Sequence, residues 1–300
     1  CYVAVVDPDG VDVAAAPPAA RALLGVVLDG ATLAGRSGTF SGHPSAAATA
    51  DRELLPPAGV AVSPAGGDAS NTSLIVHAPA GDWVIKLFRR CRAGIQPEVE
   101  MGEFFAATSW HGTPRLCGWL GYGPAGGADA DGTIAIATVH AFAPGCVTGW
   151  DRLVKLVTAA GGGDMLSGPA GDRVLAIVAA LGRATAEMHR TLASRPDLPA
   201  FAPERPTADG RRAAAARMRE HAAGVFASIE SHLSRLEPAI AGRLRAVLAA
   251  GPRLEAAFAR FAAVAPSAAD VRVHGDYHLG QVLVAEHDSK PLVAEHDSSP

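Results

Sequence analysis

Alternating apolar and polar residues divide the first part of the chain into short segments. Residues 2–6 are a run of mostly apolar side chains that stops at an Asp-Pro-Asp-Gly turn, which predicts a short strand. A second apolar segment covers 23–28, and the stretch 29–50 is rich in glycine, serine and threonine. We therefore expect residues 1–58 to form a loop-rich cap subdomain that carries no chemistry.

A β-hairpin is predicted next. Residues 74–76 and 83–88 are strand-like apolar runs with a Pro-Ala-Gly-Asp turn between them. Small residues before the first run would let backbone N–H groups and hydroxyls approach a phosphate, and Lys86 can reach the same phosphate as a point charge. A polar hairpin tip with a solvent-directed lysine explains the same pattern. The candidate phosphate-binding residues are Ser70, Asn71, Thr72, Ser73 and Lys86.

Residues 97–107 carry the signals of a helix start. Pro97 suits the first turn, and apolar residues at core-facing spacing follow it. Three glutamates, at 98, 100 and 103, are favoured near the positive end of the helix dipole. One of them can instead orient Lys86 through an ion pair, as phosphoryl transfer requires.

The run 133–139 predicts a buried strand, and an extended connection at 140–145 leaves it. In a two-lobed kinase this connection is the hinge, where backbone groups face the adenine of the nucleotide. The candidate adenine-facing residues are Val139, His140 and Phe142.

From 149 to 264 the apolar spacing is helical. Together with the strands before it, this pattern predicts an α+β fold of the bilobal protein-kinase-like kind. We expect a cap at 1–58, a β-rich nucleotide-binding lobe at 59–145 and a helical lobe with the catalytic loop at 146–300.

The most informative segment is 273–283, where apolar residues flank the polar run His-Gly-Asp-Tyr-His. The pattern predicts a loop between two short strands. Asp276 is followed five residues later by the amide of Gln281. Protein-kinase-type phosphotransferases use this spacing for an Asp that receives the proton of the attacking hydroxyl and an Asn that binds magnesium. An ordinary strand-turn-strand is the alternative, but the combination of polar groups favours a catalytic loop.

Composition excludes other classes. The chain has 300 residues, of which 49% are hydrophobic, so it can bury a core. Its net charge is -4, and no dense basic run exists beyond 89–92, which argues against nucleic acid as a partner. No apolar run reaches the roughly eighteen residues of a membrane span. The four cysteines lie far apart without a C-x-x-C pair, which fits a reducing cytoplasm.

Five segments carry a resemblance: Ala-Ser-Asn-Thr-Ser at 69–73, Ile-Lys-Leu-Phe-Arg-Arg at 85–90, the stretch 94–100, the stretch 181–189 ending in Glu-Met-His, and 274–283. With these residues the chain resembles the actinobacterial maltokinase family, which includes glucosamine kinases and shares the fold of aminoglycoside phosphotransferases. The similarity runs from about residue 52 to residue 283, and its last two segments are the most specific.

This resemblance implies an ATP-dependent sugar kinase that uses Mg²⁺ and acts on a small-molecule sugar in the cytoplasm. The first implied reaction converts maltose to maltose 1-phosphate, and the alternative converts glucosamine to its 6-phosphate. The resemblance implies that Lys86 holds the ATP phosphates, that Glu100 pairs with Lys86, that Asp276 activates the sugar hydroxyl and that Gln281 binds magnesium. His274 and His278 are the candidate substrate-binding residues.

The C-terminal segment departs from the family pattern. Val-Ala-Glu-His-Asp-Ser at 284–289 recurs at 293–298, and the chain reaches Pro300 without the further helices expected of a kinase C-lobe. Where the family has a metal-binding Asp, this chain has Glu295, whose longer side chain would displace the ion. We therefore expect a truncated helical lobe, and an inactive nucleotide-binding protein is a second hypothesis. A metal hydrolase using the two loop histidines is a third, although Gly275 stands where such a motif needs a Glu.

Overall fold

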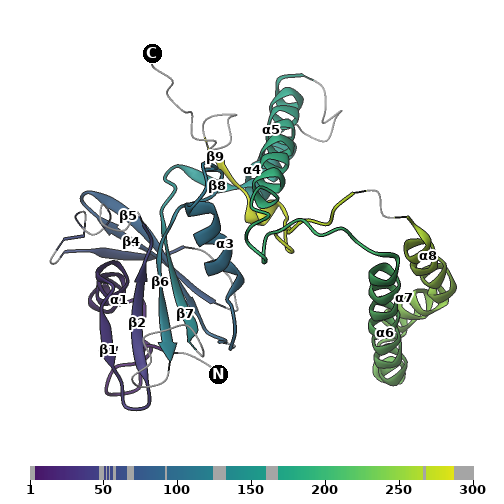
Figure 1. Cartoon of the computed structure of the whole chain (residues 1–300), viewed down its shortest axis with the longest axis horizontal. Helices are drawn as coiled ribbons and strands as arrows, with labels where there is room; N and C mark the ends of the chain where they lie inside the picture. Colours follow the sequence, from purple (N-terminus) through teal and green to yellow (C-terminus); the bar gives the residue numbers. More distant parts are fainter. Residues whose placement is uncertain are drawn as a thin grey trace. The chain divides into compact units, whose positions relative to one another are not determined.

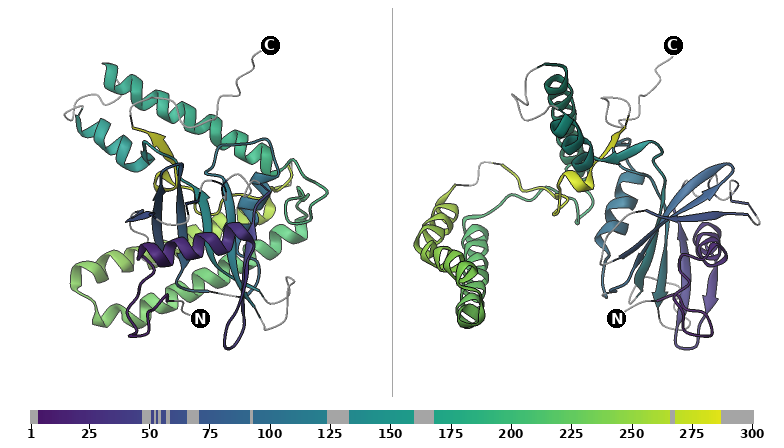
Figure 2. Two further views of the ribbon diagram at one scale, coloured as in Figure 1. Left: turned by 90° about the vertical axis from the view of Figure 1, so that its left-hand side faces the viewer. Right: turned by 180° about the vertical axis from the view of Figure 1, so that it is seen from behind.

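The computed structural model describes residues 4–46, 51, 53, 55, 56, 59–65, 71–91, 93–123, 133–159, 168–265 and 268–286. Two compact units make up the chain. The sheet unit comprises 1–188 together with 276–300, and the helical unit comprises 189–275. Their elements can be followed by colour along the chain in Figure 1 and from two other sides in Figure 2.

A seven-stranded sheet organises the sheet unit within the described residues. Its strand order is β1-β2-β6-β7-β5-β4-β3, so β7 is the central strand. Every neighbouring pair is antiparallel, and β4 and β5 form a hairpin through a short connection. The strands are β1 Thr32–Ala34, β2 Thr39–Pro44, β3 Ala61–Pro64, β4 Asn71–Ala78, β5 Gly81–Phe88, β6 Leu116–Gly123 and β7 Ile134–Ala141.

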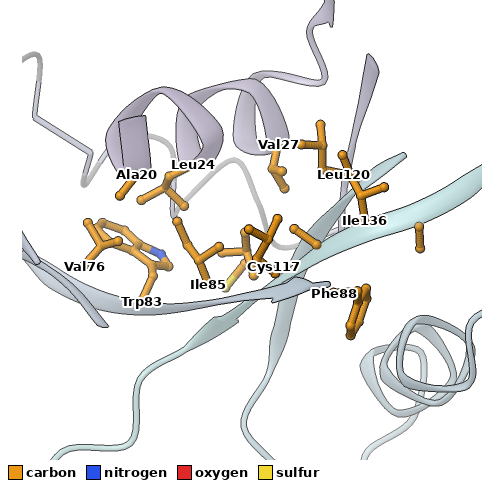
Figure 3. Packing of buried hydrophobic residues seen from close by; sticks show 14 of the residues in the cluster. Ala20, Leu24, Val27, Val76, Trp83, Ile85, Phe88, Cys117, Leu120 and Ile136 are labelled. Atoms are coloured by element: carbon orange, nitrogen blue, oxygen red, sulfur yellow. The ribbon is translucent and has the colours of Figure 1, made fainter. Parts of the chain in front are cut away.

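Side chains alternate between the two faces of β5. Trp83, Ile85 and Leu87 are almost fully buried in the core, so Lys86 must project from the opposite face. Figure 3 shows the core face, on which helix α1 (Pro17–Asp29) packs with Leu24 and neighbouring side chains against Trp83 and Ile85. Helix α1 therefore covers the core face of the sheet, and the Lys86 side chain lies on the opposite face.

Helix α3 (Pro97–Ala106) packs against β6 and β7. It begins where the sequence signals predict, because Pro97 has no N–H to leave unpaired and the Gln96 side chain accepts a hydrogen bond from the Glu98 amide at 2.9 Å. In Figure 1, α3 and α1 lie on opposite sides of the sheet. Helix α3 thus lies where it can reach the Lys86 face.

The rest of the sheet unit is a smaller layer. Strands β8 (Cys146–Thr148) and β9 (Leu283–Ala285) pair antiparallel, and they lie beside helix α4 (Gly149–Ala159) and the short helix η2 (Leu279–Gln281). Leu156 of α4, Ile177 of α5 (Gly168–Leu192) and Val284 of β9 form a second buried cluster. This pairing brings residues 279–285 back against β8 and α4.

The helical unit is built from α6 (Ala208–His232), η1 (Leu233–Arg235), α7 (Pro238–Ala249) and α8 (Gly251–Ala263). Helices α6 and α8 pack together, and the Arg219 guanidinium pairs with Glu255 at 2.8 Å across them. None of the described helices is both long enough and apolar enough to pass through a lipid bilayer.

Most predicted elements are confirmed, with several differences. In the described part of the strand predicted at 2–6, only Val6 pairs, through an isolated bridge to Asp12. The residues expected to form a separate cap share the sheet and one core with the strands of the expected nucleotide lobe. Strand β4 begins at Asn71, three residues earlier than the predicted run. The strand predicted before the polar loop is not formed. In the described residues, a single β-bridge between Asp270 and Glu204 stands there instead. The predicted domain boundaries at 58 and 145 stay predictions.

Candidate active site

An ion pair connects the central sheet to α3. Lys86 Nζ on β5 lies 2.7 Å from Glu98 Oε2, and both side chains are less than a third exposed. This contradicts the assignment of Glu100 as the partner of Lys86. Residues two positions apart on a helix point about 200° apart, so only one of the two glutamates can face the sheet, and the helix start at Pro97 selects Glu98.

The other oxygen of the Glu98 carboxylate faces strand β7. Thr138, which is fully buried, donates a hydrogen bond from Oγ1 to Glu98 Oε1 at 2.9 Å, and His140 Nε2 lies 3.3 Å from the same oxygen. Burial by itself raises the pKa of Glu98, but the hydrogen bonds and charges of His140 and Lys86 outweigh it and lower the pKa to about 2. Glu98 is therefore a fixed negative charge at neutral pH.

The residues predicted to bind phosphate divide into two groups. Asn71, Thr72 and Ser73 belong to β4 and not to a loop, with Ser73 directly opposite Lys86 in the antiparallel register. The Thr72 hydroxyl accepts a hydrogen bond from Arg89 Nε at 2.8 Å. The backbone groups of residues 71–73 pair within the sheet, because β4 begins at Asn71 and continues directly into the apolar run that follows. Ser70 and the tip of this loop lie outside the described residues.

The first two residues of the predicted hinge, 140 and 141, belong to strand β7. Val139 is buried in the core, and the His140 side chain reaches toward Glu98. The backbone amides of Ala141 and Phe142 donate to the carbonyls of Arg115 and Asp82 at 2.9 and 3.0 Å, so these two N–H groups already have partners within the protein. The reason is the length of β7, which continues two residues beyond the predicted strand.

Phe142 instead lines a cavity of about 460 Å³, whose wall also includes Trp83 and Arg115. Neither Lys86 nor Glu98 lines this cavity. A nucleotide contact from Val139, His140 or Phe142 stays a prediction.

The polar loop after residue 275 is held from two sides. His278 is the N-cap of η2, and its Nδ1 accepts a hydrogen bond from the Gly280 amide at 3.0 Å. The Tyr277 hydroxyl lies 3.1 Å from Thr185 Oγ1 on α5. Gly275 has a φ of 87°, a conformation that suits glycine because it has no Cβ. These contacts fix the loop that presents Asp276.

Asp276 is the most exposed charged group of this loop. Its side chain is 83% exposed, and His278 Nε2 lies 4.0 Å from Oδ2. Gln281, five residues after Asp276, ends η2, and its backbone N–H donates a hydrogen bond to the His278 carbonyl oxygen at 2.9 Å. His278 therefore shapes the loop, a role that the sequence does not predict, while its role as a substrate contact stays a prediction.

The roles of two further predicted residues stay predictions. His274 precedes Asp276 by two residues in the chain, and Glu295 lies outside the described residues. Asp276 and Gln281 carry the oxygen donors that Mg²⁺ prefers. In the part of the chain that the structure describes, no three His, Cys, Asp or Glu side chains form a metal-binding group. The oxygen atoms of Asp276 and Gln281 fit magnesium, but the carboxylate predicted as a further ligand belongs to Glu295, which is not among the described residues.

Sequence reasoning did not single out four side chains in these roles: Glu98 as the partner of Lys86, Thr138 and His140 as contacts of Glu98, and Thr185 as a contact of the loop. A signal existed for the first three. Thr138 lies on the predicted strand and His140 directly follows it, two residues along, while Pro97 marks the helix start. Thr185 carries no comparable signal, because it lies 92 residues from Tyr277 in the chain.

The chain is similar to several known proteins. A curated glucosamine kinase from Streptacidiphilus jiangxiensis is 32% identical over 223 residues, which are 73% of this chain and 44% of that protein. A solved glucosamine kinase, crystal form B, matches with a TM-score of 0.52 and 24% identity over 90% of this chain and 66% of that one. A glucosamine kinase in complex with glucosamine, ADP and inorganic phosphate matches with a TM-score of 0.51 and the same identity and coverage.

At that identity the solved structures show the fold alone, and they confirm the expected α+β architecture with an antiparallel sheet and a helical part. The chain spans less than half the length of the curated relative and 66% of the solved chains. The phosphotransferase enzyme family matches residues 61–294, which is most of the chain and includes Lys86, Glu98, Asp276 and Gln281. The chain therefore belongs to the phosphotransferase enzyme family.

Proposed function

We propose that this chain is, or is part of, an ATP-dependent sugar kinase, with glucosamine as the first substrate to test. One observation carries the proposal: the Lys86–Glu98 ion pair occurs together with an exposed Asp276 that precedes Gln281 by five residues. Phosphoryl transfer requires both a lysine held by a glutamate and an aspartate beside the attacking hydroxyl.

In this proposal Asp276 accepts the proton of the sugar hydroxyl as that oxygen attacks the γ-phosphorus. The carboxylate is well suited because it is exposed to a ligand and the loop around it is held by η2 and by Thr185. Lys86 contacts the ATP phosphates, and Glu98 keeps the ammonium group aimed. Gln281 would hold Mg²⁺, which supplies neutralisation of phosphate charge when bound.

Glucosamine replaces maltose as the leading substrate. The sequence resemblance covers both kinds of kinase, but the relatives reported above are glucosamine kinases and none of them is a maltokinase. The preference for glucosamine rests on this overall similarity.

The test is a sugar panel with the purified chain. ADP formation is measured with glucosamine, maltose, glucose and no sugar, and the product is identified by mass spectrometry. ATP-dependent phosphorylation of glucosamine, absent in Asp276→Asn, supports the proposal, whereas phosphorylation of maltose alone refutes the choice of sugar. Nucleotide binding without any sugar phosphorylation would favour the inactive alternative.

A further inference from the structure

His140 lies at a position where both of its ring nitrogens face oxygen atoms. Nε2 is 3.3 Å from Glu98 Oε1, and Nδ1 is 3.4 Å from the Pro114 carbonyl oxygen. The side chain is 18% exposed, and Nε2 itself is shielded from solvent without a well-aligned hydrogen bond in the described structure. A buried ring nitrogen facing a carboxylate in this way calls for a physical explanation.

The two oxygens decide which form of the ring fits. A carbonyl and a carboxylate accept hydrogen bonds only, so each of them needs an N–H group opposite. A neutral imidazole has one N–H and would turn a lone pair toward the other oxygen. Only the imidazolium has an N–H on each nitrogen, so it alone can turn a donor toward each oxygen, with an added attraction to the Glu98 charge.

The two oxygens of the Glu98 carboxylate contact two different strands. Its Oε2 contacts Lys86 on β5, and its Oε1 contacts Thr138 and His140 on β7. No other charged side chain is recorded against Glu98 in the described residues; Arg115, next to Pro114, is turned to Asp51 instead. The contact on Oε1 thus determines how the carboxylate is oriented, and with it the direction in which Oε2 points.

We propose that His140 is a positioning residue for the Lys86–Glu98 ion pair, and that its protonated ring holds Oε1 so that Oε2 stays aimed at Lys86. Its effect on phosphoryl transfer rests on the proposed function, whereas its coupling to Glu98 does not. When the ring loses a proton, one of the two contacts is lost and the carboxylate is free to turn. The lysine that contacts phosphate is then held less well.

The first experiment measures the coupling without any assay of activity. The ring-nitrogen NMR signals of His140 are assigned in the full chain by their absence in His140→Gln and are followed across pH. If the inference is right, Glu98→Gln moves the midpoint of the His140 titration to lower pH, because it removes the charge that favours the imidazolium. An unchanged midpoint overturns the inference. Circular dichroism at each pH shows that the variant is folded.

The second experiment measures the consequence for the nucleotide. ATP affinity by calorimetry, and kcat and KM wherever a sugar is phosphorylated, are determined for the wild type, His140→Ala and His140→Gln. We expect His140→Ala to weaken function about tenfold, the usual effect of one hydrogen bond to a charged group. His140→Gln keeps a donor that does not titrate, so it should restore most of the loss and remove the histidine-dependent limb of the pH profile.

His77→Gln is the matched control. His77 lies on β4 of the same sheet and contacts Ser63 and Asp82 instead of Glu98, so its replacement should leave the pH profile unchanged. Equal effects of both replacements would contradict a specific role of His140. If the wild type phosphorylates no sugar but the His140 titration still responds to Glu98→Gln, the proposed function fails and the inference about His140 stands.

Discussion

Arg115 binds the buried carboxylate of Asp51 through two parallel hydrogen bonds of 2.6 and 2.8 Å. The Asp51 side chain is 5% exposed, and Arg115 lies just before β6. Burial by itself raises the pKa of Asp51, but the hydrogen bonds and charge of Arg115 outweigh it and lower the pKa. The pair therefore ties the segment around residue 51 to the central sheet.

Breaking this pair should destabilise the protein. Asp51→Asn removes the charge that Arg115 needs, and we expect a loss of about 1–3 kcal/mol in the free energy of unfolding. The expected loss of stability is moderate because the Arg115 side chain is 40% exposed and water can solvate it. Urea unfolding of the wild type and the variant measures the difference. Arg212→Ala, which breaks the exposed contact with Asp209 on α6, is the control and should change stability by less than about 0.5 kcal/mol.

The identity of the lysine partner can be tested with a matched pair of variants. Glu98→Gln leaves Lys86 without its counter-charge, and we expect kcat to fall at least about tenfold, because phosphoryl transfer needs the lysine held in place. Glu100→Gln lies on the same helix turn and should have a much smaller effect. ADP release with the best sugar of the panel measures both. A larger loss in Glu100→Gln would restore the assignment made from sequence.

Acid should weaken the protein partly through Glu98. The folded state lowers the pKa of this carboxyl from 4.5 to about 2. Its contribution to stability is therefore complete above about pH 4.5 and is lost as the pH falls toward 2. The difference in unfolding free energy between the wild type and Glu98→Gln should shrink as the pH is lowered from about 6 to about 3. A difference that stays constant over this range would mean that the carboxylate is not selectively stabilised by folding.

Asp276 is predicted to act in the transfer step and not in nucleotide binding. Asp276→Asn keeps the size of the side chain and removes the proton acceptor, so kcat should fall at least about a hundredfold. ATP affinity, measured by calorimetry, should stay within about threefold of the wild type, because the change leaves Lys86 in place. More than a tenth of the wild-type kcat in this variant would rule out Asp276 as the base.

The sequence by itself determined the elements and two of the chemical groups. Apolar alternation predicted β4, β5 and β7, and the Pro97 signal predicted α3, because strand and helix periods depend on neighbouring residues alone. Lys86 and Asp276 could be singled out as candidates because each belongs to a short motif that is continuous in the chain. Such local patterns do not require knowledge of which surfaces meet.

Only the tertiary structure decided which side chains meet. Glu98 and Glu100 have the same chemistry and nearly the same position in sequence, and the packing of α3 on the sheet separates them. His140 was predicted to lie at a hinge, but it belongs to β7. The end of a strand depends on the neighbouring strands that pair with it, and the linear sequence does not show them. Arg115 and Asp51 are 64 residues apart, and no local pattern joins them. Contacts of this kind depend on long-range packing, which a linear pattern does not encode in a readable form.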